Sequence, residues 1–175
     1  MCVGKYMIKE ELKAKLEVLQ KIAKEVNENA KKIDGIKNDA LVVVSDIEGR
    51  AGDFLVKLKH TGVIDKVEVD KDTGKLIIHL NKNFCGTIDF CGDLTCYKKD
   101  LVPPFGNEIV IEVFEELLAQ IKKHNENNKA KDKQIQFVDV PGNHEFYDFR
   151  GGDDKEALLS LEDGGKDPLL KSLKA

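Results

Sequence analysis

The chain has 175 residues, and 41% of them are hydrophobic, which is enough for one domain with a buried core. The net charge is −4 with acidic and basic residues interspersed, so the sequence carries no basic patch for nucleic acid. No hydrophobic run approaches membrane-spanning length, and the first residues lack the apolar stretch of a secretion signal. We therefore expect a cytoplasmic protein.

Residues 6 to 33 predict a long amphipathic helix, which forms the N-terminal segment 1–36. Hydrophobic residues alternate at spacings of four and three: Leu12, Leu16, Leu19, Ala23, Val26, Ala30 and Ile33. This spacing is also that of a coiled coil, which would make the helix a site of self-association. We prefer packing on the chain's own domain, because two seam positions are alanine and the run spans only about three heptads.

Four further elements follow from periodicity and turn residues. Phe54, Leu55 and Leu58 indicate a helix over residues 51–60, ended by Gly62. Alternating apolar residues on both sides of an Asp- and Gly-containing turn predict a β-hairpin over residues 66–80. A helix capped by Asn107 is expected over residues 108 to 124, and a short one over residues 153–161. Residues 162–175 are expected to be a linker or tail.

Three hydrophobic runs end abruptly in polar residues, as strands do at the rim of a sheet. Residues 41–45 lead into Asp46-Ile47-Glu48-Gly49-Arg50, and residues 87–91 lead into Gly92-Asp93. Residues 135–140 lead into Pro141-Gly142-Asn143-His144-Glu145. If the three strands are parallel neighbours, their polar ends converge at one edge, where open α/β sheets bind ligands.

The order of these three motifs resembles the calcineurin-like metallophosphoesterase superfamily. Glu145 makes the last motif most similar to the phosphoprotein phosphatase and diadenosine-tetraphosphatase branch. The resemblance spans residues 41 to 150 and implies an α/β (α+β) domain over residues 37–161, with a sheet flanked by helices. The long N-terminal helix and the hairpin would be additions to that fold, and the second half of the family's two-sheet core is expected to be missing.

The resemblance also implies a site with two divalent metal ions, Mn, Fe, Zn or Mg. Asp93 would bridge the ions, and the other metal ligands would be Asp46, Glu48 and Asn143. Glu48 stands where the family usually has histidine, and a carboxylate there favours Mn²⁺ or Mg²⁺. His144 would protonate the leaving oxygen, with Glu145 orienting its ring. Positive charge for the phosphate would come from Arg50, Lys98 and Lys99.

The implied activity is metal-dependent hydrolysis of a phosphate ester or anhydride on a phosphorylated protein, nucleotide or small molecule. The metal ligand set is incomplete, because no histidine follows His144. Three interpretations stay open. The chain is the N-terminal part of a longer phosphoesterase; it is a family member that has lost catalysis and serves as a binding or regulatory module; or a second chain completes the site.

Overall fold

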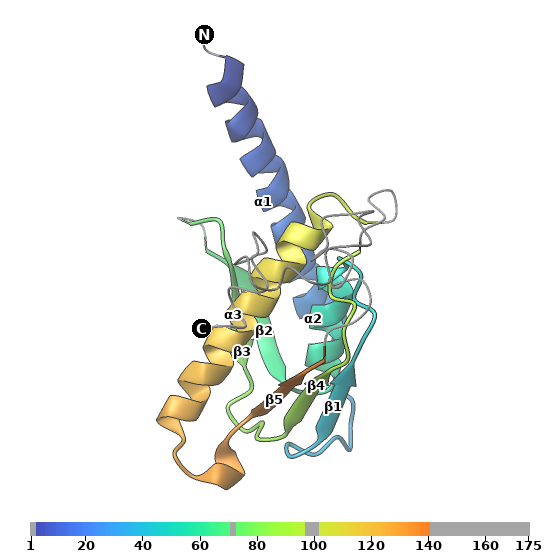
Figure 1. Ribbon diagram of the computed structural model, residues 1–175, viewed down its shortest axis with the longest axis vertical. Helices are drawn as coiled ribbons and strands as arrows, with labels where there is room; N and C mark the ends of the chain where they lie inside the picture. Colours follow the sequence, from blue (N-terminus) through green and yellow to red (C-terminus); the bar gives the residue numbers. More distant parts are fainter. Residues whose placement is uncertain (1–2, 71–72, 97–101, 141–175) are drawn as a thin grey trace, which may run out of the picture.

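The computed structural model describes residues 3–70, 73–96 and 102–140, with side chains from residue 10 onward. This part of the chain is a mixed α/β structure with a parallel sheet, an antiparallel hairpin and three α-helices (Figure 1). The elements in chain order are α1 Val3–Asn29, β1 Leu41–Val44, α2 Ala51–His60, β2 Ile64–Val69, β3 Leu76–Leu80, β4 Thr87–Phe90, α3 Gly106–Asn127, the 3-10 helix Lys131–Lys133 and β5 Gln136–Asp139.

The three strands with polar ends form one parallel sheet in the order β1-β4-β5. Asp89 in β4 lies opposite Val43 in β1 on one side and Val138 in β5 on the other. The predicted parallel arrangement is therefore confirmed, and all three strands point their carboxyl ends to the same edge. The segment with α2 and the hairpin connects β1 to β4, and α3 connects β4 to β5, as parallel pairing requires.

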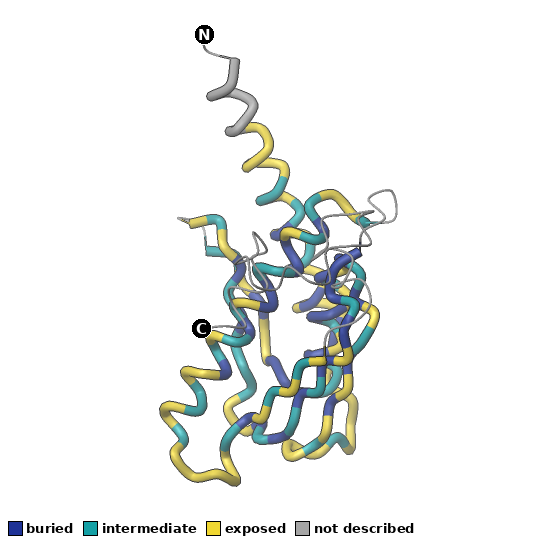
Figure 2. The backbone as a smooth tube through the Cα atoms, in the orientation of Figure 1, coloured by how far each residue is buried: buried dark blue, intermediate teal, exposed yellow. Residues whose placement is uncertain are grey.

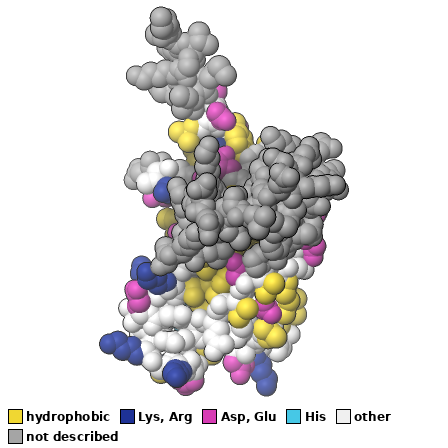
Figure 3. Space-filling view, viewed as in Figure 1, with side chains coloured by type: hydrophobic (Ala, Val, Ile, Leu, Met, Phe, Trp, Pro, Cys, Tyr) yellow, Lys and Arg dark blue, Asp and Glu magenta, His cyan; other side chains and the backbone are white. Residues whose placement is uncertain are grey.

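The two faces of this sheet differ in burial (Figure 2). Val42, Val44, Ile88 and Phe90 point inward and are buried. Leu41, Val43, Val138 and Val140 lie on the opposite face, where side chains alternate outward, and are exposed. We call this second surface the outer face; hydrophobic side chains gather over these strands in Figure 3.

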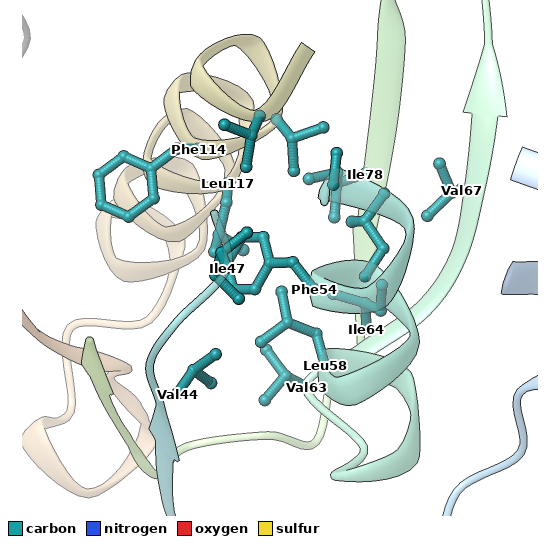
Figure 4. Close-up of a cluster of buried hydrophobic side chains, with 14 of the residues drawn as sticks. Val44, Ile47, Phe54, Leu58, Val63, Ile64, Val67, Ile78, Phe114 and Leu117 are labelled. Carbon is teal, nitrogen blue, oxygen red and sulfur yellow. The ribbon is translucent and has the colours of Figure 1, made fainter. Parts of the chain in front are cut away.

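The core lies between the inner face of the sheet, the hairpin and the helices (Figure 4). Aromatic rings connect its layers. The ring of Phe90 in β4 lies 6.4 Å from that of Phe54 in α2 and 5.3 Å from that of Phe114 in α3, and Phe114 lies 5.5 Å from Phe137 in β5. All three pairs are edge-to-face, the arrangement that the aromatic quadrupole favours. The helix predicted over residues 108 to 124 is present as α3, and its residues Ile109 and Leu117 are buried in the core.

The predicted hairpin is also confirmed, as β2 pairs antiparallel with β3. Helix α1 packs on β2, and α3 packs on β3. The Asn27 side chain of α1 holds β2 by both of its polar atoms: Nδ2 donates to the Val67 carbonyl at 2.6 Å, and Oδ1 accepts from the Val67 amide at 3.1 Å. The long helix is thus tied to the hairpin by an amide as well as by apolar contacts.

Helix α1 departs from its prediction at both ends. It ends at Asn29, before the predicted end at residue 33, and Ile33 is 55% exposed. Leu12 is 62% exposed, because the first turns extend beyond the rest of the molecule (Figure 1). Leu19 and Val26 belong to the core, so the middle of the seam packs within the chain. Self-association through this helix stays a prediction. No helix among the described residues is long and apolar enough to cross a membrane.

An ion cluster joins α1 to the start of α3. The ammonium group of Lys15 lies 2.6 Å from the carboxylates of both Glu108 and Glu112, and the lysine side chain is only 13% exposed. Burial lowers the pKa of Lys15, but the hydrogen bonds and charges of the two glutamates outweigh this effect and raise the pKa above its usual 10.5.

Replacing Leu19 by alanine tests the intramolecular packing of α1. We expect Leu19→Ala to lower the free energy of unfolding by about 2–5 kcal/mol, because Leu19 is fully buried. Leu12→Ala is the matched control on the exposed part of the same seam and should change it by less than about 0.5 kcal/mol. Urea unfolding measures both; similar losses for the two variants would instead indicate a seam buried between chains.

Replacing Lys15 by methionine tests the ion cluster through its pH dependence. The folded chain holds this proton more tightly than the unfolded chain, so the stabilisation is complete below pH 10.5 and disappears as the pH rises through the higher folded pKa. Lys15→Met should therefore lower the free energy of unfolding by about 1 kcal/mol near neutral pH and by much less in strong alkali. Lys13→Met, at an exposed neighbour, should show no such trend in urea unfolding at the two pH values.

Candidate functional site

The loops that follow β1 and β4 are hydrogen-bonded to each other beyond the ends of the strands. The Cys91 amide donates to the Val44 carbonyl at 2.8 Å, as the ladder ends. The Glu48 amide then donates to the Asp93 carbonyl at 2.8 Å, and the Gly49 amide to the Leu94 carbonyl at 2.9 Å. The two acid-bearing loops therefore run side by side at the carboxyl edge of the sheet.

Three acidic residues in these loops have left-handed backbone. The φ angles are 54° at Asp46, 48° at Glu48 and 57° at Asp93. This conformation costs a non-glycine residue roughly 1–2 kcal/mol, and glycine would remove the cost. Asp46 is exposed, and Glu48 and Asp93 are half-buried. Backbone strain held at accessible acids is a feature of functional sites, and these are the three described acids that the sequence predicted as metal ligands.

Asn107 at the start of α3 holds the loop after β4 in place. Its Nδ2 donates to the Cys96 carbonyl at 2.8 Å, and its Oδ1 accepts from the Cys96 amide at 3.0 Å. The predicted capping role is wrong, because α3 begins at Gly106 and Phe105 is its N-cap. The sequence does not reveal this role of Asn107, because it depends on a contact with the loop after β4. An asparagine at the start of a helix gives the same local pattern whether it caps the helix or binds another segment.

Close backbone contacts join the loop after β1 to the same helix start. A Cβ atom at Gly49 would lie 2.7 Å from Oδ1 of Asn107 and 2.7 Å from a methyl carbon of Val102. One at Gly106 would lie 2.6 Å from the Gly49 carbonyl oxygen. Both positions therefore require glycine, and the loop carrying Asp46 and Glu48 rests directly on the start of α3.

Glu48 and Arg50, predicted as a metal ligand and a phosphate contact, form an ion pair at 3.0 Å. Both side chains are partly exposed, at 36% and 48% respectively. Water screens such a pair, so the pair by itself contributes little to stability. As the pair stands, each residue neutralises part of the charge that the other would offer to a metal ion or a phosphate.

The remaining predicted site residues, Lys98, Lys99, Asn143, His144 and Glu145, lie outside the described residues. Strand β5 leads toward the last three, and the Val140 amide donates to the Phe90 carbonyl at 2.9 Å, so the chain reaches residue 140 beside the end of β4.

The three histidines with described positions form hydrogen bonds with residues outside the two acid-bearing loops. His60 bonds the Lys31 carbonyl, His79 bonds Glu68, and His124 bonds the Lys133 carbonyl. In the described chain, no group of three or more His, Cys, Asp or Glu residues has the arrangement of a metal site. Asp46, Glu48 and Asp93 offer oxygen donors only, which fits the chemistry of Mg²⁺ or Mn²⁺ but supplies part of a ligand set.

Comparisons with protein-family models, curated proteins and solved structures find no match for this chain. A function is therefore inferred from the geometry of the strand ends and from the sequence motifs that they carry.

Replacing Gly49 by alanine tests the packing under the candidate site. Gly49 has φ of 76° and close neighbours, whereas Gly35 has φ of 86° and no atom within 4 Å of the place that a Cβ would occupy. Gly35→Ala should lower the free energy of unfolding by about 1–2 kcal/mol, which is the cost of a left-handed backbone conformation for alanine. Gly49→Ala should cost a further 1–3 kcal/mol or so from overpacking. Equal losses in urea unfolding would contradict the contact between this loop and α3.

Proposed function

We propose that this chain is a metal-dependent phosphoesterase, of the calcineurin-like type, with its site at the carboxyl edge of the parallel sheet. One observation carries the proposal: the strained, acid-bearing loops after β1 and β4 are joined by the hydrogen bond from the Glu48 amide to the Asp93 carbonyl. The sheet order supports it, because β4 lies between β1 and β5, from which the other predicted ligands extend.

In this proposal Asp46, Glu48, Asp93 and Asn143 hold the metal ions, and this set of protein ligands is incomplete by itself. Asp93 follows the central strand, so it is the acid best placed to serve neighbours on both sides. When bound, divalent ions would neutralise phosphate charge and supply a hydroxide at neutral pH. His144 is the proposed proton donor to the leaving oxygen, with Glu145 fixing its orientation. Lys98 and Lys99 are proposed to attract the phosphate by charge.

The proposed substrates are phosphate esters or anhydrides, on a protein, a nucleotide or a small molecule. The oxygen-only donor set among the described residues favours Mn²⁺ or Mg²⁺ over softer metals. Asp46 is exposed and Glu48 is half-buried at the sheet edge, so solvent reaches both residues.

A second candidate is a binding or regulatory module without catalysis. The ion pair between Glu48 and Arg50 favours it, because the pair occupies two of the groups that hydrolysis would use. Such a module would still bind a divalent ion or a phosphate group at this edge, and it would not turn a substrate over.

Asp93→Asn tests the proposal, with Asp89→Asn as the matched control. Both replacements remove one charge from the β4 segment, but Asp89 lies in the middle of the strand on the outer face. We expect Asp93→Asn to lower Mn²⁺-dependent hydrolysis of an aryl phosphate at least ~100-fold and to weaken Mn²⁺ binding in calorimetry. Asp89→Asn should retain both.

The outcomes separate the two candidates. Identical hydrolysis by both variants would remove Asp93 from the mechanism. Mn²⁺ binding that depends on Asp93, in a wild-type chain without turnover, would favour the binding module.

A further inference from the structure

A cavity of about 430 Å³ lies between α1 and the starts of α2 and α3. Helix α1 contacts α2, and α2 contacts α3, so residues of all three helices surround it (Figure 1). Its volume falls within the roughly 300–1,000 Å³ of pockets that bind small organic molecules. The cavity is therefore of the size that accepts one organic group, and it is too small for a folded protein partner.

The walls of the cavity are mostly apolar. Val18 and Ile22 come from α1, Ile109 comes from α3, and Pro103 and Pro104 precede α3. The two α1 side chains are half-buried and both prolines are exposed, so each still has surface in contact with water. An apolar ligand would remove part of that surface from water, which is favourable.

The charged side chains around the cavity balance one another. Lys21 and Arg50 are positive, Glu25 and Asp53 are negative, and all four are exposed. A charged group that entered the cavity would lose hydration without gaining a net opposite charge, which is unfavourable. The lining therefore favours an uncharged, apolar group.

The loop after β1 connects this cavity to the candidate site. Gly49 and Arg50 both line the cavity. The Gly49 amide donates to the Leu94 carbonyl of the loop after β4 at 2.9 Å. Nη2 of Arg50 donates to the Glu48 carboxylate at 3.0 Å. Arg50 therefore lies at the boundary between the cavity and a predicted metal ligand, and it is itself a predicted phosphate contact.

We propose that the cavity binds the apolar organic group of a substrate whose phosphate is held at the candidate site. This assignment rests on the proposed function and narrows the substrates to phosphate esters of compact, apolar alcohols, for which 1-naphthol is a suitable probe. Part of the wall belongs to α1, which lies outside residues 41 to 150 that carry the family resemblance. In this proposal α1 contributes to the choice of substrate.

Gly52, in the first turn of α2, allows the cavity to be filled by one substitution. It lines the cavity and is half-buried. A Cβ atom at Gly52 would lie 3.7 Å from Cγ1 of Ile22, an ordinary contact, and that is its one neighbour within 4 Å among the described residues outside its own helix turn. Gly52→Leu therefore extends a side chain toward a cavity wall without displacing the core. Lys57→Leu adds the same side chain at an exposed position of α2 away from the cavity and is the matched control.

The test uses the 175-residue chain and two measurements. Calorimetry without added metal measures the binding of 1-naphthol, and Mn²⁺-dependent hydrolysis gives KM for 1-naphthyl phosphate and for methyl phosphate. We expect Gly52→Leu to weaken 1-naphthol binding at least ~10-fold, and to raise KM for 1-naphthyl phosphate relative to that for methyl phosphate by a similar factor. Lys57→Leu should retain the wild-type values. Urea unfolding shows whether both variants are folded.

The outcomes separate this proposal from the proposed function. Hydrolysis of both esters with equal KM in the wild-type chain, or 1-naphthol binding that Gly52→Leu leaves unchanged, would overturn the role of the cavity and leave the hydrolysis standing. Loss of 1-naphthol binding in Gly52→Leu, in a chain that hydrolyses neither ester, would support the cavity as a site for an apolar group and contradict the proposed hydrolysis. The wild-type comparison of the two esters needs no variant, so it decides the matter even if Gly52→Leu fails to fold.

Discussion

The position of β4 between β1 and β5 is the constraint on which the other features of this structure depend. Parallel pairing on both sides brings three strand ends to one edge, and the ladder continues into the loops through the bond from Glu48 to Asp93. Phe90, the last residue of β4, packs edge-to-face on Phe54 and Phe114. The end of β4, which leads into the candidate site, is therefore fixed by aromatic rings from α2 and α3. The core thereby holds the strained backbone of the acidic residues in place.

Asparagine side chains make a second set of long-range connections. Asn27, Asn107 and Asn125 each use one donor and one acceptor to bind the backbone of a single distant residue. Asn107 and Asn125 belong to α3, so that helix holds the loop after β4 near one end and Ile135, at the entry to β5, near the other. An amide can satisfy both backbone groups, whereas a carboxylate can only accept. Helix α3 therefore sets the spacing between the two segments that lead to the proposed site.

Hydrophobic periodicity predicted the elements whose burial follows local patterns. The parallel strands, the helix 51–60 and the hairpin agree with the structure. Two predictions were wrong. Ile33 is exposed because α1 ends at Asn29, and Asn107 binds the Cys96 backbone rather than capping α3. The ion pair of Glu48 with Arg50 was also missed, since both residues were assigned separate roles. Local sequence determines which elements form, and the tertiary fold determines what their polar ends contact.

Asp89 has a consequence for contacts with other chains. Hydrophobic strands exposed before a domain is complete are prone to stack on other chains. Here a carboxylate lies in the centre of the apolar patch, with valines opposite it on both neighbouring strands. Stacking of two such patches would bury two like charges against each other, and the Cys91 thiol, 3.8 Å from an Asp89 carboxylate oxygen, is a weak donor that offsets little of a cost of several kcal/mol. The charge thus disfavours face-to-face stacking of this patch on another chain.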